Sequence, residues 1–224
     1  MKIASFSSTF KFTSLEHMKK IAIIDDHSLI RHVLVDVIQS FEDYSVTLEA
    51  QNGNDFFKKL NPLALPDIAL IDINMPIMDG YETVKMISKD YPQIKMMAVS
   101  IENNEELIFR MIKAGVRAYL NKDFKPTELK KALDSLYLYG IYLADFEYPL
   151  SDMQTPSSKL KELFTAKELW FLDLLSQGKD YSNIAQNMNV NDEEILSQLY
   201  DKLHVKSRTS LVVYAYHLNL LTCF

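Results

Sequence analysis

The feature that most constrains the fold is an apolar run that ends on a carboxylate. Residues 68–71, Ile-Ala-Leu-Ile, are followed at once by Asp72, and Pro66 and Pro76 bound the segment. Four apolar residues between such breakers are typical of a strand buried on both faces, as in a parallel sheet. The sequence therefore predicts a central strand with Asp72 at its carboxyl end, where open α/β sheets place ligands and chemistry.

A second strand with an acidic end precedes this one in the chain. Residues 21–24 form another apolar run, and it ends on Asp25 and Asp26. If the two strands are parallel neighbours, three carboxylates converge at one edge of the sheet. They would repel one another, so we expect a divalent cation among them, and an all-oxygen site suits Mg²⁺ or Mn²⁺. We interpret His27, which follows, as a loop residue rather than a metal ligand.

Two further strand ends supply a hydroxyl and an amine. Residues 96–100 end on Ser100, and residues 118–122 end on Lys122. Asp72 is placed to act as a nucleophile towards a phosphoryl group, whose oxygens would then bind the hydroxyl and the ammonium. One ion pair at ~4 Å in an effective dielectric near 20 contributes about 4 kcal/mol before desolvation. Lys122 is therefore expected to matter to an anion held at Asp72.

Helical periodicity alternates with the strands. Apolar residues recur at helical spacing in five segments, which are residues 28–41, 55–60, 81–90 and 105–114 and the segment after Pro126. Residues 46–50 are a fifth strand, and Ser28 is expected to cap the first helix. Five strands alternating with five helices predict a doubly wound, flavodoxin-like α/β domain with right-handed crossovers.

The order of these motifs resembles the receiver domain of bacterial two-component response regulators. The matching motifs are Asp25-Asp26, Asp72-Ile-Asn-Met-Pro76, Met78-Asp-Gly80, Ser100 and Tyr119-Leu-Asn-Lys122, within about residues 19 to 140. The resemblance implies that Asp72 accepts phosphate from a histidine kinase.

The resemblance also implies roles for the surrounding residues. Mg²⁺ would be ligated by Asp26, Asp72 and the carbonyl of Asn74, with Asp25 assisting through water. Lys122 would hold the phosphate, and Ser100 and Tyr119 would move inward on phosphorylation. Where the family usually carries a small residue after the switch hydroxyl, this chain has Ile101. Its β-branched side chain is expected to narrow access to Asp72 or to hinder Tyr119.

An enzymatic alternative is a phosphatase with an aspartyl nucleophile on a similar sheet. Such enzymes generally need a second acid two residues after the nucleophile, to protonate the leaving group. Asn74 occupies that position and cannot serve as an acid. We therefore expect no enzyme.

The length and composition of the chain allow a second domain and indicate the cellular compartment. The chain has 224 residues, of which 48% are hydrophobic, and a net charge of −6, which argues against nonspecific coating of nucleic acid or anionic membrane. A single cysteine and the absence of a long apolar run fit a cytoplasmic protein. We expect a disordered extension at residues 1–17, a receiver at 18–144, a linker at 145–159 and an output domain at 160–224.

The output segment reads as four short helices with a helix-turn-helix. Thr165 and Glu168 form a capping box, residues 181–188 and 192–203 are helical, and Ser207 caps a last helix that runs to about Leu220. Motifs from Phe164-Thr165 to Ser207-Arg208-Thr209 resemble the LuxR/NarL-type DNA-binding domain. This resemblance implies that residues 192–203 enter the major groove.

The charge of that helix opposes DNA binding. Residues 192–201 contain four acidic residues and no basic one, although affinity for DNA rests largely on Lys and Arg. The candidate DNA contacts are Asn191, Gln198, Lys202, Lys206 and Arg208. Two interpretations stay open. One is a transcription factor that binds DNA and forms a homodimer on phosphorylation, and the other is an output domain for protein interaction or dimerisation.

Overall fold

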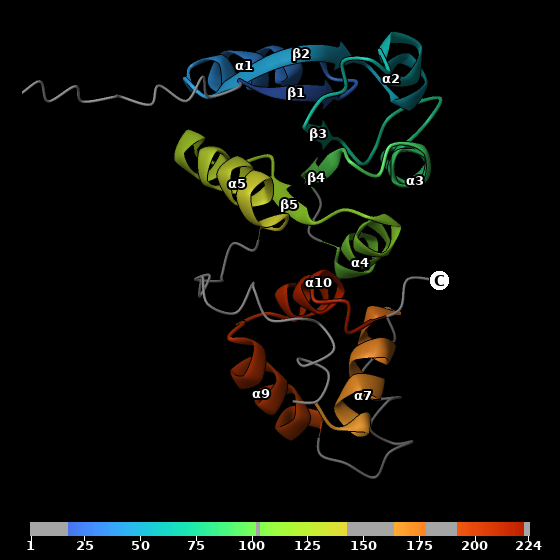
Figure 1. The fold of residues 1–224 in the computed structure, drawn as a ribbon, viewed down its shortest axis with the longest axis vertical. Coiled ribbons are helices and arrows are strands. Elements are labelled where there is room, and N and C mark those ends of the chain that lie inside the picture. Colours follow the sequence, from blue (N-terminus) through green and yellow to red (C-terminus); the bar gives the residue numbers. More distant parts are fainter. Residues whose placement is uncertain (1–17, 102–103, 143–163, 178–191, 222–224) are drawn as a thin grey trace, which may run out of the picture.

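A five-stranded parallel sheet forms the amino-terminal part of the chain (Figure 1). The computed structural model describes residues 18–101, 104–142, 164–177 and 192–221. The strands are β1 (Lys19–Ile24), β2 (Tyr44–Ala50), β3 (Ile68–Ile71), β4 (Lys95–Ser100) and β5 (Ala118–Asn121), in the order β2-β1-β3-β4-β5. The predicted doubly wound fold is confirmed. The expected extension, the linker and the helix at 181–188 lie outside the described residues.

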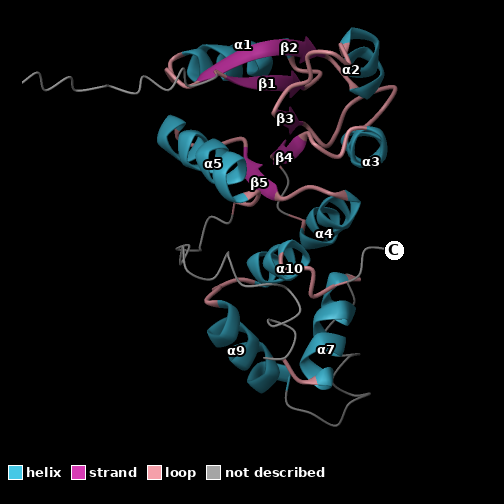
Figure 2. Ribbon diagram, in the orientation of Figure 1, coloured by secondary structure: helices cyan, strands magenta, loops and turns pink. Residues whose placement is uncertain are grey.

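Helices cover both faces of the sheet (Figure 2). They are α1 (Ser28–Gln39), α2 (Gly53–Lys59), α3 (Gly80–Asp90), α4 (Glu105–Ala114) and α5 (Pro126–Tyr139). Successive strand residues point to opposite faces of the sheet. Ile21 and Ile23 pack beneath α1 and α5, whereas Ala22 and Ile24 pack beneath α2, α3 and α4. Both sets are fully buried, which explains why these strands read as continuous apolar runs.

Several helix boundaries differ from the prediction. Ser28 is the first helical residue rather than the cap, because the non-helical backbone lies at His27, which makes no side-chain cap bond. The first helix ends at Gln39 instead of residue 41. The last helix ends at His217 instead of Leu220, where Asn219 takes a positive φ of 52° that an α-helix cannot continue. The Ser28 cap and these helix ends were wrong by one to three residues.

Three described helices make up the carboxyl-terminal region, namely α7 (Ala166–Ser176), α9 (Asp192–Leu203) and α10 (Arg208–His217). The predicted capping box of Thr165 and Glu168 is confirmed, with both reciprocal hydrogen bonds present. Glu168 also accepts hydrogen bonds of 2.7 and 2.9 Å from the Lys202 ammonium. One buried carboxylate therefore caps α7 and ties it to α9.

The carboxyl-terminal region packs on the sheet domain through α10 and α4. Ile108, Phe109 and Ile112 of α4 belong to the same buried cluster as Leu211 and Val212 of α10. Figure 1 shows α10 next to α4, on the side away from the strands. No helix in the described ranges has the length and hydropathy that a bilayer crossing needs. Helix α4 thus contacts the sheet on one side and the output helices on the other.

Candidate functional site

The three predicted carboxylates meet at the carboxyl edge of the sheet. Strands β1 and β3 are parallel neighbours in which Ile24 pairs with Ile71, so the residues that follow them emerge side by side. Ligand atoms of Asp25, Asp26, His27 and Asp72 all lie within 4.8 Å of one another. Asp25 and Asp72 are 2% and 5% exposed, respectively, so much of their charge is shielded from water.

Lys122, which follows the carboxyl end of β5, lies in this pocket. The Lys122 ammonium lies 2.7 Å from Oδ2 of Asp25 and 2.8 Å from Oδ2 of Asp72. Burial raises the pKa of the Asp72 carboxyl, and the hydrogen bond from Lys122 opposes that rise. Burial alone would lower the pKa of Lys122, but its two carboxylate partners raise it. Lys122 therefore remains charged and offsets part of the negative charge of the pocket.

His27 lies in the loop before α1, as expected, and its ring belongs to the same cluster. Its Nδ1 atom lies 2.8 Å from Oδ1 of Asp26, 3.4 Å from Oδ1 of Asp25 and 4.0 Å from Oδ2 of Asp72. The ring is 62% exposed, so it flanks the pocket from the solvent side. The only signal in the sequence was its position directly after the acidic pair.

The donor set fits a divalent cation bound by oxygen. Three carboxylates face one ammonium, so the cluster keeps an excess of negative charge. The Oδ1 atom of Asp26 is buried and accepts no hydrogen bond within the described part of the chain, although it contacts the His27 ring. A divalent cation bound there would stabilise this buried carboxylate oxygen. Asn74 lies in the exposed loop that follows Asp72, and its carbonyl as a ligand stays a prediction.

The two expected switch residues lie at different depths. Ser100 ends β4 and is 1% exposed, and its carbonyl accepts a 2.9 Å hydrogen bond from the Lys122 amide. Tyr119 is partly buried and packs against the core beneath α2–α4 and also against the cluster shared by α4 and α10. Ile101 is 73% exposed. The movement of Ser100 and Tyr119 on phosphorylation stays a prediction. The obstruction by Ile101 of access to Asp72, or of Tyr119, stays a prediction too.

The loop between Asp72 and α3 holds a strained residue. Ile77 has a φ of 73° and is 80% exposed. A β-branched residue in this left-handed region costs about 1–2 kcal/mol, because its Cβ crowds the backbone.

Replacing Ile77 with Asn is expected to raise the free energy of unfolding by about 1 kcal/mol, because Asn tolerates this backbone conformation. Urea unfolding of both proteins measures the difference. Ile101→Asn is the matched control, since this residue is similarly exposed and its φ is not positive. Equal effects of the two substitutions would contradict the explanation by backbone strain.

The candidate DNA contacts do not form one open basic surface. Lys202 is held by Glu168, and Arg208 lies 3.2 Å from Glu105 of α4, with its guanidinium 5.4 Å from the centre of the Phe109 ring. Gln198 and Lys206 are exposed, and Asn191 lies outside the described residues. Two of the three candidate cations are therefore engaged with acidic partners.

Comparisons with known proteins agree with the fold. The family described as the response regulator receiver domain matches residues 21–134. Over 208 residues the chain is 28% identical to the response regulator protein VraR of Staphylococcus saprophyticus, which covers 90% of this chain and 98% of the relative.

Solved structures give the same result. The receiver domain of NarL from Mycobacterium tuberculosis is 25% identical with a TM-score of 0.51, over 54% of this chain and 97% of that one. RcsB of Salmonella typhimurium, at 23% identity and a TM-score of 0.51, covers 88% of this chain and 98% of its own and supports the fold alone. The predicted resemblance to LuxR/NarL-type response regulators is confirmed.

Proposed function

Because the chain belongs to the response-regulator family, we propose that it accepts a phosphoryl group on Asp72 from a histidine kinase and thereby controls its output helices. The family consists of signalling proteins rather than enzymes, as the sequence led us to expect. The observation that carries the proposal is the meeting of Asp72, Asp25 and Lys122 in one pocket. We assign the receiver to residues 18–144, the linker to 145–159 and the output domain to 160–224, in a cytoplasmic protein.

The pocket has the groups that phosphoryl transfer to a carboxylate requires. The Asp72 carboxylate attacks phosphorus, and the bond to the donor breaks. Oδ1 of Asp72 accepts a 2.8 Å hydrogen bond from the Ile73 amide, which fixes the orientation of the carboxylate. Lys122 lies close enough to bind an oxygen of the arriving phosphoryl group.

Mg²⁺ would be held by Asp26, Asp72 and the Asn74 carbonyl, with Asp25 assisting through water, and would supply charge neutralisation when bound.

The strand β5, which leads to Lys122, also contacts the cluster that contains the output helices. Tyr119, three residues before Lys122, packs against the cluster that α4 shares with α10. At the first turn of α4, Glu105 binds Arg208, which is also a candidate DNA contact. Movement of Ser100 and Tyr119 on phosphorylation would shift α4 and release α10 and Arg208 for DNA binding or for homodimer formation.

DNA binding before and after phosphorylation tests this output. Fluorescence anisotropy with promoter-derived duplexes, over a range of NaCl concentrations, is expected to give a salt-dependent affinity. Treatment with acetyl phosphate and Mg²⁺ should change that affinity. An absence of binding at low salt in both states would rule out a direct role in transcription.

The charge of α9 favours a second candidate, in which the output domain binds a protein. Glu193, Glu194 and Asp201 are exposed on this helix, whereas Lys202 is engaged with Glu168. The double substitution Glu193→Lys and Glu194→Lys separates the two candidates. It should strengthen DNA binding if α9 lies against phosphates, and weaken capture of a basic protein partner if α9 binds protein. Glu42→Lys together with Glu82→Lys, at two exposed sites on the receiver, makes the same change in net charge and is the control.

A further inference from the structure

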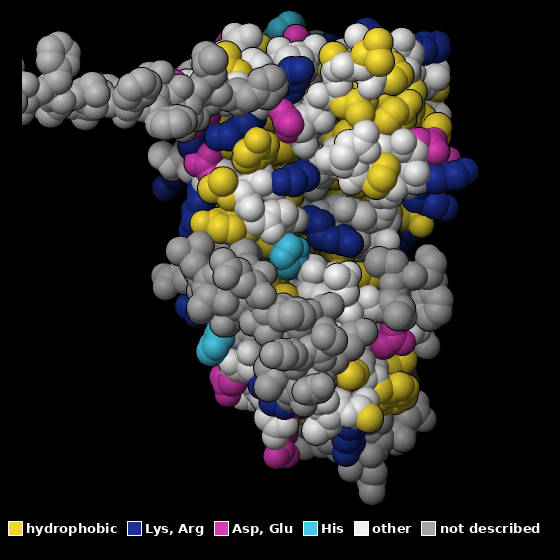
Figure 3. Space-filling model, in the orientation of Figure 1, with side chains coloured by type: hydrophobic (Ala, Val, Ile, Leu, Met, Phe, Trp, Pro, Cys, Tyr) yellow, Lys and Arg dark blue, Asp and Glu magenta, His cyan; other side chains and the backbone are white. Residues whose placement is uncertain are grey.

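A basic groove lies at the amino-terminal ends of the strands, opposite to Asp72. Its volume is about 730 Å³, and it runs between α3, the start of β4 and the carboxyl ends of α4 and α5. Its charged lining residues are all cationic, and they are Lys85, Lys89, Lys95, Lys113 and Arg117. Figure 3 shows Lys and Arg side chains across the middle of this face, between the sheet and the output helices.

The carboxyl ends of nearby helices compensate part of this positive charge. Three helices end at the groove, and each carboxyl end carries about half a negative charge, or about −1.5 in total. Arg117 donates to the Ile112 carbonyl at the end of α4, and Lys95 donates to the Tyr137 carbonyl in the last turn of α5. Five cations therefore line one groove, in a chain whose net charge is −6.

The groove also has an apolar and aromatic lining. Ile94, Met96 and Leu136 line it, and the Tyr81 ring stands at its wall with the Lys85 ammonium 5.5 Å from the ring centre. The Lys95 ammonium is partly buried, which lowers its pKa although the nearby Asp67 carboxylate opposes this shift. A partly desolvated ammonium interacts more strongly with an anion than a fully hydrated one does. The volume lies within the usual range of small-molecule sites, roughly 300–1,000 Å³.

We propose that this groove binds a polyphosphate group, either free or as part of a nucleotide. Lys85 and Lys89 of α3 and Lys113 of α4 line the groove, and they would bind phosphate oxygens. The apolar lining beside them suits the organic part of a nucleotide. This site is separate from the phosphoacceptor pocket, which is acidic and lies at the other edge of the sheet.

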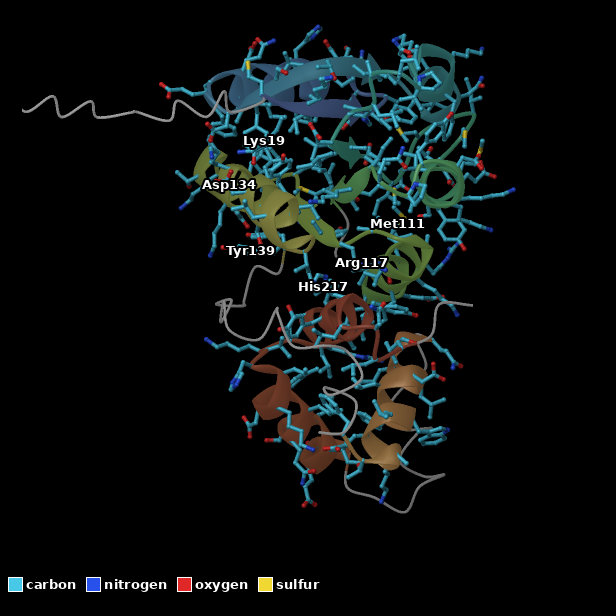
Figure 4. The ribbon with its side chains drawn as sticks, viewed as in Figure 1. Lys19, Met111, Arg117, Asp134, Tyr139 and His217 are labelled. Atoms are coloured by element: carbon cyan, nitrogen blue, oxygen red, sulfur yellow. The ribbon has the colours of Figure 1, made fainter. Side chains whose placement is uncertain are left out.

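The position of the groove connects it to the output helices. The Arg117 guanidinium lies 5.7 Å from the centre of the Tyr216 ring on α10, and Figure 4 shows Arg117 and His217 near each other at this junction. A polyphosphate that draws Arg117 into the groove would weaken the contact with α10. Binding at the groove would therefore act on the same interface as phosphorylation.

Isothermal titration of the full chain with tripolyphosphate and with ATP, in buffer without Mg²⁺, tests the proposal. Both probes are expected to bind in the sub-millimolar range. The double variant Lys89→Gln and Lys113→Gln should bind about tenfold more weakly, because two exposed charge contacts are lost. Lys58→Gln with Lys131→Gln removes the same charge from exposed sites elsewhere and should bind as wild type does.

Each result supports or overturns the proposal. Tighter binding of ATP than of tripolyphosphate identifies a nucleotide, and equal binding identifies free polyphosphate. The Asp72→Asn variant is expected to bind the probes as well. The test is therefore independent of phosphorylation at Asp72. Failure of both probes to bind, equal weakening in the two double variants, or binding of duplex DNA alone would overturn it.

Discussion

Asp72→Asn is expected to abolish phosphorylation. After incubation with acetyl phosphate and Mg²⁺, mass spectrometry of the intact protein should find one added phosphoryl group on wild type and none on the variant. The amide lacks the anionic oxygen that attacks phosphorus. Since burial already raises the pKa of the Asp72 carboxyl, a neutral group suits this position. The free energy of unfolding should therefore change by less than about 1 kcal/mol.

A nearby aspartate provides the matched control for this substitution. Asp123→Asn removes an exposed carboxylate from the residue after Lys122, and it should leave phosphorylation unchanged. A phosphoryl group found on the Asp72→Asn protein would show that another carboxylate, such as Asp26, is the acceptor. Unmodified wild type under the same conditions would contradict the proposed function itself.

Gly80→Ala is expected to cost about 3 kcal/mol of stability, near the upper end of the range for overpacking. A Cβ atom at Gly80 would lie 2.3 Å from the Asp72 carbonyl oxygen and 2.7 Å from the Cα of Ile73. Both atoms are backbone, so no side-chain rotation relieves the clash. The shift would displace Asp72 and should slow phosphorylation roughly 100-fold. Urea unfolding and the rate of labelling by acetyl phosphate measure the two effects.

Gly140→Ala separates this steric cost from the cost of backbone conformation. Gly140 has a φ of 75°, and the nearest atom to an added Cβ is 3.6 Å away. Only the left-handed conformation is penalised there, which amounts to about 1 kcal/mol. A loss at Gly80 no larger than the loss at Gly140 would contradict the close approach of Gly80 to the phosphoacceptor loop.

The strands and their polar ends could be predicted because they rest on local patterns. The apolar runs at residues 21–24 and 68–71 locate β1 and β3, and parallel pairing then brings Asp25 and Asp72 to one edge. The caps at Thr165 and Ser207 are local for the same reason, since each bonds an amide three residues away. Helix ends were less predictable, because backbone pairing and tight turns decide them.

What the sequence by itself determined was which polar groups stand at the ends of buried strands, since a period of two or of 3.6 residues is a local property. Only the tertiary structure decided which partners the long side chains choose. Lys122 binds two carboxylates, Lys202 binds Glu168, and Arg208 binds Glu105. The last two pairs join residues 34 and 103 positions apart in the chain. The distance between two side chains on separate elements depends on how the elements pack, so a sequence pattern cannot fix it.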